Sequence, residues 1–279
     1  MAEVTAAQVV KLREMTNAGM MDCKRALVEA GGDMEKAVEI LRKKGAATAA
    51  HKAAREAREG VIVAHVLPGA RAGVLVEVNC ETDFVARNDL FRAFAQEVAA
   101  RLAADPQADL EPLRQDAVSR IRENLQIARH ARLEVEGHGL IAAYIHTGAQ
   151  IGVLVEVGAT RPETVATEAF KQLVRDITLQ IAASSPMAVS REQLPETVIA
   201  KEREIAAEQV KGKPPAVVQR IVEGKLEKFY QTVCLLEQGY VKQNSEISVR
   251  EYIDRVGREL GDSITVRRFL RYQVGELAT

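Results

Sequence analysis

The histidines and cysteines of this chain, which have the widest chemical repertoire among its side chains, are scattered rather than clustered. None of the five histidines has the spacing of a metal-ligand pair, and the three cysteines form no CxxC pair. The phosphate-binding loop of nucleotide hydrolases, the nucleophile elbow and the zinc-protease motif are also missing from the sequence. We therefore expect that the chain is not an enzyme and has no catalytic residue, no metal and no cofactor. The residues concerned are His51, His65, His130, His138, His146, Cys23, Cys80 and Cys234.

The run Thr82-Asp83-Phe84-Val85 is the clearest candidate for function, because it places a hydroxyl, a carboxylate and an aromatic ring directly after a strand pattern. Such a group can bind a partner without any covalent chemistry. Two interpretations are open. In one, Asp83 caps the helix that follows and Phe84 packs on its first turn as a hydrophobic staple. In the other, Phe84 is presented at the end of the strand as an anchor for a partner's pocket.

An internal repeat defines the elements that must position this run. Residues 60–104 align with residues 139–183 at a constant offset of 79, and 14 of these 45 positions are identical without a gap. A duplication of this length predicts two similar subdomains packed side by side. At the same offset, residues 82–85 meet Arg161-Pro162-Glu163-Thr164. We therefore expect the run to have no structural counterpart in the second subdomain.

Each repeat shows the pattern of a strand, a tight Gly-Ala turn, a second strand and an amphipathic helix. In the first repeat we expect a further helix near Asp116–Asn124 and a strand near Ile127–Glu136. The second repeat has the matching pair at its far end, where Ser248 and Glu251 form a capping-box pattern and residues 264–274 alternate as a strand.

The remaining segments read as helices. The first 45 residues predict three short helices, the third capped by Asp33 and ending at Gly45. Between the two parts of the second repeat, Gly212-Lys213-Pro214-Pro215 separates two helical runs, which predicts an antiparallel hairpin. The expected fold class is α+β, with a duplicated core. The expected parts are a three-helix module (1–45), a linker (46–59), core unit one (60–138) and core unit two (139–279), with the helical hairpin at about 187–246.

The balance of charges argues against a nucleic-acid binder. The chain carries 38 basic and 39 acidic side chains, for a formal charge of −1, whereas such binders show a basic excess on one domain. The first residues are charged where a signal peptide needs an apolar core, and no run approaches 18 apolar residues. Three unpaired cysteines are typical of buried thiols in a reducing compartment. We expect a cytoplasmic protein without direct nucleic-acid or membrane contacts.

Two motifs stand out in the sequence: Glu77-Val78-Asn79-Cys80 followed by Thr82-Asp83-Phe84-Val85, and Leu12-Arg13 with Ala18-Gly19-Met20-Met21-Asp22-Cys23-Lys24. Both resemble motifs of bacterial elongation factor Ts, and the resemblance extends over nearly the whole chain, including the duplicated core and the hairpin. The resemblance implies guanine-nucleotide exchange on the GTPase elongation factor Tu. It also implies that the N-terminal module resembles a ubiquitin-associated domain, and that Thr-Asp-Phe-Val intrudes beside the magnesium site of the GTPase.

By the same resemblance, Arg13, Met20 and Met21 are expected to contact the GTPase, and the second core unit to touch another of its domains. The chain departs from the family pattern at two places. Gln180 stands where some members have a partner-contacting histidine, and the sequence ends at Thr279 where some members continue into a helical module. Contacts from these two places are not carried over.

Two other function classes are left open by the residues alone. One is a passive scaffold without exchange activity, in which Phe84 is only structural. The other is an enzyme whose site is built from scattered residues. Self-association through core unit two or the hairpin is a further open point.

Overall fold

The computed structural model describes residues 4–16, 18–210, 212 and 214–276, so that Lys213, in the predicted turn of the hairpin, lies outside this part. The helices are α1 (Ala6–Thr16), α2 (Met20–Glu29), α3 (Met34–Lys52), α4 (Asp83–Ala86), α5 (Asp89–Ala104), α6 (Glu111–Ile121), α7 (Pro162–Ala166), α8 (Glu168–Ser184), α9 (Glu196–Glu208), α10 (Pro215–Val233) and α11 (Val249–Leu260). The strands are β1 (Glu59–Val66), β2 (Ala72–Cys80), β3 (Gln126–Glu134), β4 (His138–Ile145), β5 (Ile151–Ala159) and β6 (Ile264–Gln273).

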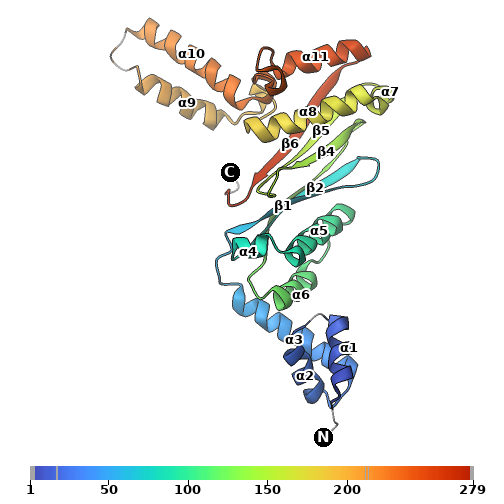
Figure 1. Cartoon of the computed structure of the whole chain (residues 1–279). Coiled ribbons are helices and arrows are strands. Elements are labelled where there is room, and N and C mark those ends of the chain that lie inside the picture. Colours follow the sequence, from blue (N-terminus) through green and yellow to red (C-terminus); the bar gives the residue numbers. More distant parts are fainter. Residues whose placement is uncertain (1–3, 17, 211, 213, 277–279) are drawn as a thin grey trace.

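The predicted α+β class is confirmed. Two three-stranded sheets lie together in the middle of the molecule, with α5 and α6 on one side and α7 and α8 on the other (Figure 1). The module of α1, α2 and α3 lies beyond α6, at the opposite end from the hairpin of α9 and α10.

The N-terminal module is a small three-helix bundle whose boundaries have local causes. Asp33 Oδ1 accepts the backbone N–H groups of Glu35 and Lys36, at 3.0 and 3.1 Å, and so begins α3. The segment after α2 turns at Gly31, where φ is +63°. Its buried core consists of Val9, Leu12, Ala18, Cys23, Ala26, Leu27, Ala37 and Leu41.

The prediction that the third helix ends at Gly45 is wrong, because α3 continues to Lys52. Gly45 is buried where α3 passes α6, and a β-carbon built on it would lie 3.5 Å from Cβ of Ser119. The glycine therefore permits close helix packing instead of ending the helix. Ala49, within the predicted linker, is 1% exposed in the core of the first unit. The division of the chain at residue 45 stays a prediction.

The two sheets follow one plan, so the sequence repeat is also a structural repeat. Their strand orders are β1-β2-β3 and β4-β5-β6, with all neighbours antiparallel. Both first turns use a left-handed Gly-Ala pair, with φ of +81° and +53° at 69–70 and +88° and +59° at 148–149. Both central strands also shift register at the same point, after Glu77 and after Glu156.

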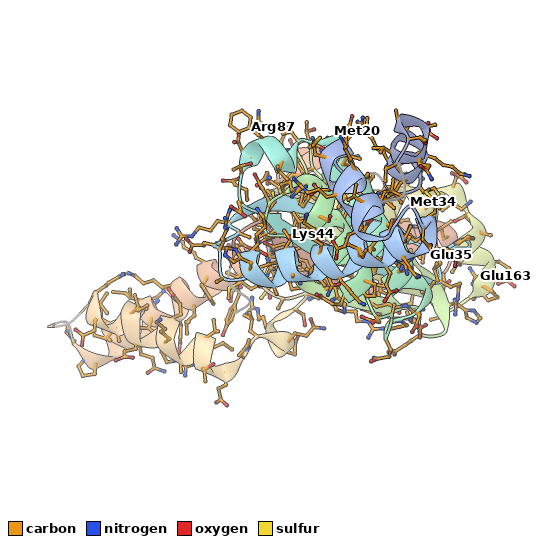
Figure 2. All side chains as sticks on the ribbon, turned by 90° about the horizontal axis from the view of Figure 1, so that it is seen from below. Met20, Met34, Glu35, Lys44, Arg87 and Glu163 are labelled. Atoms are coloured by element: carbon orange, nitrogen blue, oxygen red, sulfur yellow. The ribbon has the colours of Figure 1, made fainter. Side chains whose placement is uncertain are left out.

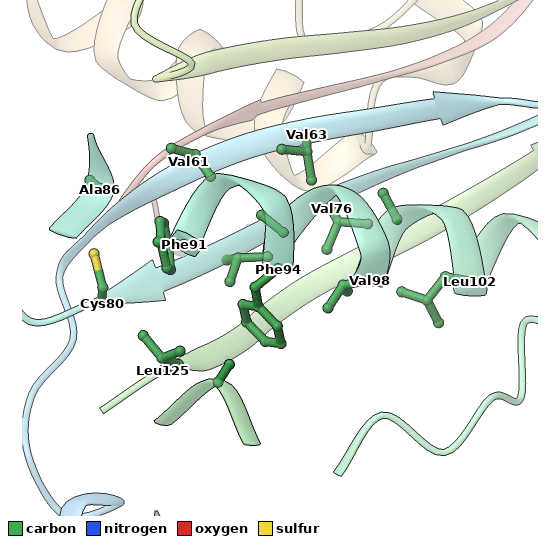
Figure 3. Packing of buried hydrophobic residues seen from close by; sticks show 14 of the residues in the cluster. Val61, Val63, Val76, Cys80, Ala86, Phe91, Phe94, Val98, Leu102 and Leu125 are labelled. Atoms are coloured by element: carbon green, nitrogen blue, oxygen red, sulfur yellow. The ribbon is translucent and has the colours of Figure 1, made fainter. Parts of the chain in front are cut away.

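One long helix covers a face of the sheet in each unit. The apolar side of α5 packs on β1 and β2, with Phe91 fully buried (Figure 3). In the second unit α8 packs on its sheet in the same way, and Phe170, at the equivalent position, is also fully buried. The shared phenylalanine therefore holds the helix against the sheet in both units. Other members of the first core are Val61, Val63, Val76, Cys80, Ala86, Phe94, Val98, Leu102 and Leu125.

The two sheets meet through reciprocal contacts between isoleucines and glycines. A β-carbon on Gly152 would lie 2.4 Å from Cγ2 of Ile62, and one on Gly73 would lie 3.0 Å from Cγ2 of Ile141. Each isoleucine thus fills the space that the other unit's glycine leaves open. The buried layer between the sheets consists of Ile62, Leu75, Leu133, Val135, Ile141 and Leu154.

Elements from the far end of the chain complete the second unit, as predicted. Ser248 Oγ accepts the N–H of Glu251 (3.2 Å), and the Glu251 carboxylate accepts the N–H of Ser248 (2.6 Å), so the capping box that begins α11 is confirmed. Strand β6 pairs with β5 as β3 pairs with β2. The insertion between α8 and α11 therefore leaves the plan of the unit unchanged.

The inserted helices α9 and α10 form the predicted hairpin, which projects from the second unit (Figure 1). At its base, Arg191 forms ion pairs with Glu227 (2.5 Å) and with Glu237, and its guanidinium lies 4.4 Å from the centre of the Tyr230 ring. The hairpin is thus tied to the core by charged and aromatic contacts. The apolar cluster between its two helices is Ala206, Val210, Val222 and Leu226.

Candidate functional site

A four-residue helix, α4, presents the Thr-Asp-Phe-Val run at the end of β2. Thr82 is its N-cap, because the hydroxyl accepts the N–H of Val85 at 3.3 Å. Asp83 is the first helical residue, and its carboxylate forms an ion pair with Arg87 at 3.1 Å. The interpretation of Asp83 as the cap is therefore wrong, since the residue before it already supplies the acceptor.

The backbone before α4 is held by a carboxylate from another segment. Glu123, which follows α6, accepts the N–H groups of Glu81 (2.9 Å) and Thr82 (3.1 Å) through Oε2. Its other oxygen accepts the Thr82 hydroxyl at 2.7 Å. Bonds to an ionised acceptor are stronger than neutral ones, so α4 starts from a well-fixed position.

Cys80, the last residue of β2, supports the same corner. Its thiol donates to the carbonyl oxygen of Thr82 at 3.2 Å. Burial, and then the negative charge of Glu123, raise the pKa of Cys80 to about 12. The thiol is therefore neutral at physiological pH and acts as a hydrogen-bond donor rather than a nucleophile.

Phe84 points away from the protein, with 83% of its surface exposed. Its neighbours in the helix do the opposite, because Val85 packs partly on the first core and Ala86 is buried within it. The interpretation of Phe84 as a staple that packs on its own helix is therefore wrong. A large apolar side chain exposed on a fixed backbone is typical of a surface that binds a partner.

The three module residues expected to bind a partner are also exposed. Met20 and Met21, in the first turn of α2, are 41% and 59% exposed, and Arg13 is exposed on α1. Exposed methionines make adaptable apolar contacts. Figure 2 shows Met20 and Arg87, the residue that directly follows α4, on the same side of the molecule. The two candidate surfaces thus face one side from separate helices.

Within the described part of the chain, no three or more His, Cys, Asp and Glu side chains lie where they could hold a metal ion together. No helix of that part is long and apolar enough to cross a lipid bilayer. Cys23, Cys80 and Cys234 are free and buried, which confirms the prediction that these thiols are buried.

Residues 81–276, from just after β2 to just beyond β6, match the protein family described as Elongation factor TS. The chain belongs to this family. It is 46% identical to elongation factor Ts of Symbiobacterium thermophilum over 99% of this chain and 93% of that protein. Identity is 42% both with elongation factor Ts of Trichlorobacter lovleyi (98% and 93% covered) and with that of Prosthecochloris aestuarii (99% and 100%). Elongation factor Ts proteins are, in general, nucleotide-exchange factors for elongation factor Tu.

Gln180, which the resemblance placed where some members have a partner-contacting histidine, is fully buried. Its side-chain oxygen accepts the N–H of Val241 at 3.0 Å, and its amide nitrogen donates to the carbonyl of Gly239 at 3.2 Å. The residue therefore fastens the segment before α11 to α8. In this structure it is not available for contact at the surface.

The second unit does have a short helix, α7, at the place of α4, so the expectation of no structural counterpart is wrong. Asp262 accepts the N–H of Arg161 (3.1 Å) just as Glu123 accepts that of Thr82. Arg161 forms no side-chain cap, and Glu163 stands where the first unit has its exposed phenylalanine. The backbone corner is thus repeated, and the side chains on it differ.

One residue that fixes the site, Glu123, was not predicted from the sequence. A signal was present in the segments after α6 and α11, which read Arg122-Glu123-Asn124-Leu125 and Gly261-Asp262-Ser263-Ile264. Both place an acid directly after a left-handed residue. The match lies outside the repeat at offset 79, because the hairpin insertion changes the spacing.

Proposed function

We propose that this chain releases GDP from elongation factor Tu by placing Phe84 as a wedge beside the magnesium and phosphate site of the GTPase. The main support is that Phe84 is 83% exposed on a helix whose start is held by Glu123. Burial of an exposed apolar ring in a partner removes it from water and so favours binding. A buried aromatic anchor of this kind contributes about 2 kcal/mol or more to binding.

The other residues of the run have supporting roles in this proposal. A GTPase holds its nucleotide largely through magnesium and through backbone donors around the phosphates. The Asp83 carboxylate, about half exposed beside Arg87, would disturb the charges and hydrogen bonds that position the magnesium ligands. Thr82 and Val85 keep the helix in place, one as the cap and the other by packing on the core.

Arg13, Met20 and Met21 are proposed to dock the module on the GTPase and so to supply affinity. The factor then stabilises the nucleotide-free state through contacts that the nucleotide-bound state cannot make. By linkage, the factor weakens nucleotide binding by the same ratio as nucleotide weakens binding of the factor. Incoming nucleotide therefore displaces the factor, which acts repeatedly.

The proposal is tested with elongation factor Tu loaded with fluorescent GDP. Substoichiometric amounts of this chain should accelerate GDP release in the presence of excess unlabelled nucleotide. A passive scaffold would bind the GTPase without changing the release rate, and that result would overturn the proposal.

A further inference from the structure

A short chain of contacts joins the two surfaces of the proposed function. Asp22 lies in the first turn of α2, and its Oδ2 accepts Arg122 Nη2 at 2.6 Å. The next residue, Glu123, binds the N–H and the hydroxyl of Thr82, at 3.1 and 2.7 Å. Phe84 follows two residues later on α4. Two non-covalent links therefore separate the methionine surface of the module from the exposed ring.

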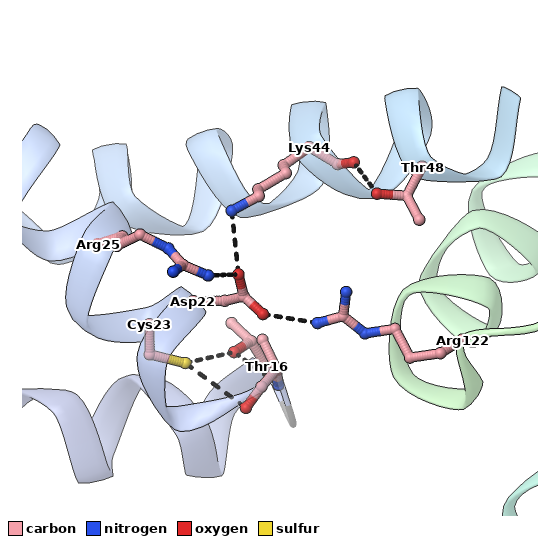
Figure 4. Close-up of polar contacts among 8 residues, drawn as sticks. Thr16, Asp22, Cys23, Arg25, Lys44, Thr48 and Arg122 are labelled. Atoms are coloured by element: carbon pink, nitrogen blue, oxygen red, sulfur yellow. Dashed lines mark hydrogen bonds and ion pairs between the residues drawn. The ribbon is translucent and has the colours of Figure 1, made fainter. Parts of the chain in front are cut away.

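The link at Asp22 is a network rather than a single surface pair (Figure 4). The carboxylate contacts Arg25 (2.7 Å), Lys44 (3.0 Å) and Arg122 (2.6 Å), while its own side chain is only 13% exposed. Hydrogen bonds from Arg25, then from Lys44, hold the pKa of Asp22 well below its usual range. An isolated exposed pair adds little to stability, but several cations around one carboxylate fix its position.

The backbone of Arg122 gives independent support for a specific role of its side chain. Its φ is +69°, a left-handed conformation that favours glycine, and the equivalent residue of the second unit is Gly261 with φ of +62°. Arginine is therefore not the residue that the backbone prefers. Its guanidinium reaches Asp22, and its carbonyl accepts Nζ of Lys52 at the end of α3. The second unit, which carries no such module, has the glycine.

We propose that Arg122 is a positioning residue that holds the Met20 and Met21 surface at a fixed separation from Phe84, so that one partner engages both at once. This inference rests on the proposed function. When two surfaces are linked rigidly, binding of the first raises the effective concentration of the second. A loosely attached module loses that advantage although all of its contact residues remain.

Arg122→Gly is the most specific test. Glycine accommodates the left-handed backbone and leaves the hydrogen bonds of Glu123 to Thr82 in place, while the guanidinium is removed. We expect an unchanged thermal midpoint and about tenfold weaker binding to nucleotide-free elongation factor Tu, measured by calorimetric titration. Arg122→Lys keeps a cation at this position and should retain most of the affinity for nucleotide-free elongation factor Tu. Arg101→Ala, which breaks the exposed 2.5 Å pair with Glu97, is the matched control and should bind like the wild type.

A double-mutant cycle separates positioning from a merely additive loss. Met20→Ala should cost less affinity in the Arg122→Gly background than in the wild type, because the module is then no longer presented together with Phe84. Equal costs in the two backgrounds, or an Arg122→Gly variant that binds within twofold of the wild type, would overturn the inference.

Spin labels read the separation directly. Val28→Cys on α2 and Leu90→Cys on α5 replace side chains that are 57% and 56% exposed, whereas the native cysteines are buried. Arg122→Gly should broaden the distance distribution between the two labels. Weaker binding with an unchanged width would mean that Arg122 touches the partner itself, which contradicts positioning. If the wild type fails to accelerate GDP release, the proposed function fails, and a broadened distribution would still establish the mechanical link.

Discussion

Phe84 of α4 and Glu163 of α7 occupy equivalent positions in the two repeats, each as the second residue of a short helix. Both side chains are exposed. Water solvates a carboxylate well, whereas a phenyl ring in the same place leaves apolar surface uncovered. We therefore expect the functional difference between the two units at this corner to come from the side chain and not from the backbone.

Replacing Phe84 with alanine should leave the fold intact and slow GDP release. Because the ring is 83% exposed, the free energy of unfolding should change by less than about 0.5 kcal/mol. Loss of an anchor of about 2 kcal/mol should lower the stimulated release rate roughly 30-fold. Stopped-flow fluorescence measures the rate, and Met187→Ala, at a residue 58% exposed, serves as the control. A lower melting temperature with normal exchange by the folded fraction would show that the ring is structural.

The double variant Met20→Ala, Met21→Ala should weaken binding to nucleotide-free elongation factor Tu about tenfold, since it removes apolar contact area from the module without touching its core. Calorimetric titration measures the affinity, and equal values for variant and wild type would refute the docking role. Deleting residues 1–54 is a less specific experiment, because it also takes Ala49 out of the core of the first unit.

Elements with a local cause could be predicted from the sequence. Asp33 and the Ser248–Glu251 pair cap helices within one turn of themselves, and the repeat at offset 79 indicated the duplicated sheets. Gly45 was misinterpreted because its role depends on Ser119, far along the chain. A glycine that ends a helix and one that allows two helices to approach closely look alike in sequence.

The candidate site could be predicted in its residues but not in its geometry. The break in the repeat drew attention to Thr82–Val85, yet capping by Thr82 and exposure of Phe84 depend on how Glu123 holds the preceding backbone. That contact joins segments whose proximity follows from the packing of α6 beside α5. No local pattern contains this information.

Gly152→Ala should destabilise the contact between the two sheets. The added methyl would lie 2.4 Å from Cγ2 of Ile62 and 2.9 Å from Cδ1 of Ile145, and overpacking of this kind costs about 1–3 kcal/mol. Gly224→Ala is the control, because nothing lies within 4 Å of its added β-carbon in α10, where alanine favours the helix by up to about 1 kcal/mol. The midpoint of urea unfolding, followed by circular dichroism, should therefore fall for Gly152→Ala and rise for Gly224→Ala. A shift of Gly152→Ala in the same direction as the control would contradict the tight packing.

The cluster around Asp22 predicts a defined acid response. Bonds from Arg25 and then Lys44 lower the pKa of Asp22 in the folded state. Its contribution to stability is therefore complete above the unfolded pKa of about 3.9 and is lost as the pH falls toward the folded value. Asp22→Asn should lower the melting temperature equally at about pH 7 and pH 5, and less near pH 3. The loss in the free energy of unfolding should not exceed about 1 kcal/mol, because the cations are partly exposed. Calorimetry measures the melting temperatures. A difference between wild type and Asp22→Asn that grows as the pH falls would contradict the lowered pKa of Asp22.

The distal part of the hairpin should be dispensable for exchange. Replacing residues 203–224 with a short Gly-rich turn removes Ala206 and Val222 from the seam but keeps the base, where Arg191 pairs with Glu227. GDP release should stay within about twofold of the wild type, because the first unit has the same plan without a hairpin. A large loss of rate in a variant that still melts cooperatively would show that the hairpin braces the partner or a second copy. Sedimentation of the wild type and of the shortened variant would test self-association, which stays a prediction.

Ile62 of the first unit packs on Gly152 of the second, and Ile141 of the second packs on Gly73 of the first. This reciprocal contact has the form of an isologous interface, in which each side offers the same patch to the other. Two identical chains use such contacts to form a dimer with a two-fold axis. Here the two halves are covalently joined, so they need not remain identical. Residues near the axis, such as Gly73 and Gly152, have to satisfy both halves at once, whereas peripheral corners are free to diverge. One half can therefore carry an aromatic wedge and the other a hairpin, an asymmetry that a dimer of identical chains cannot have.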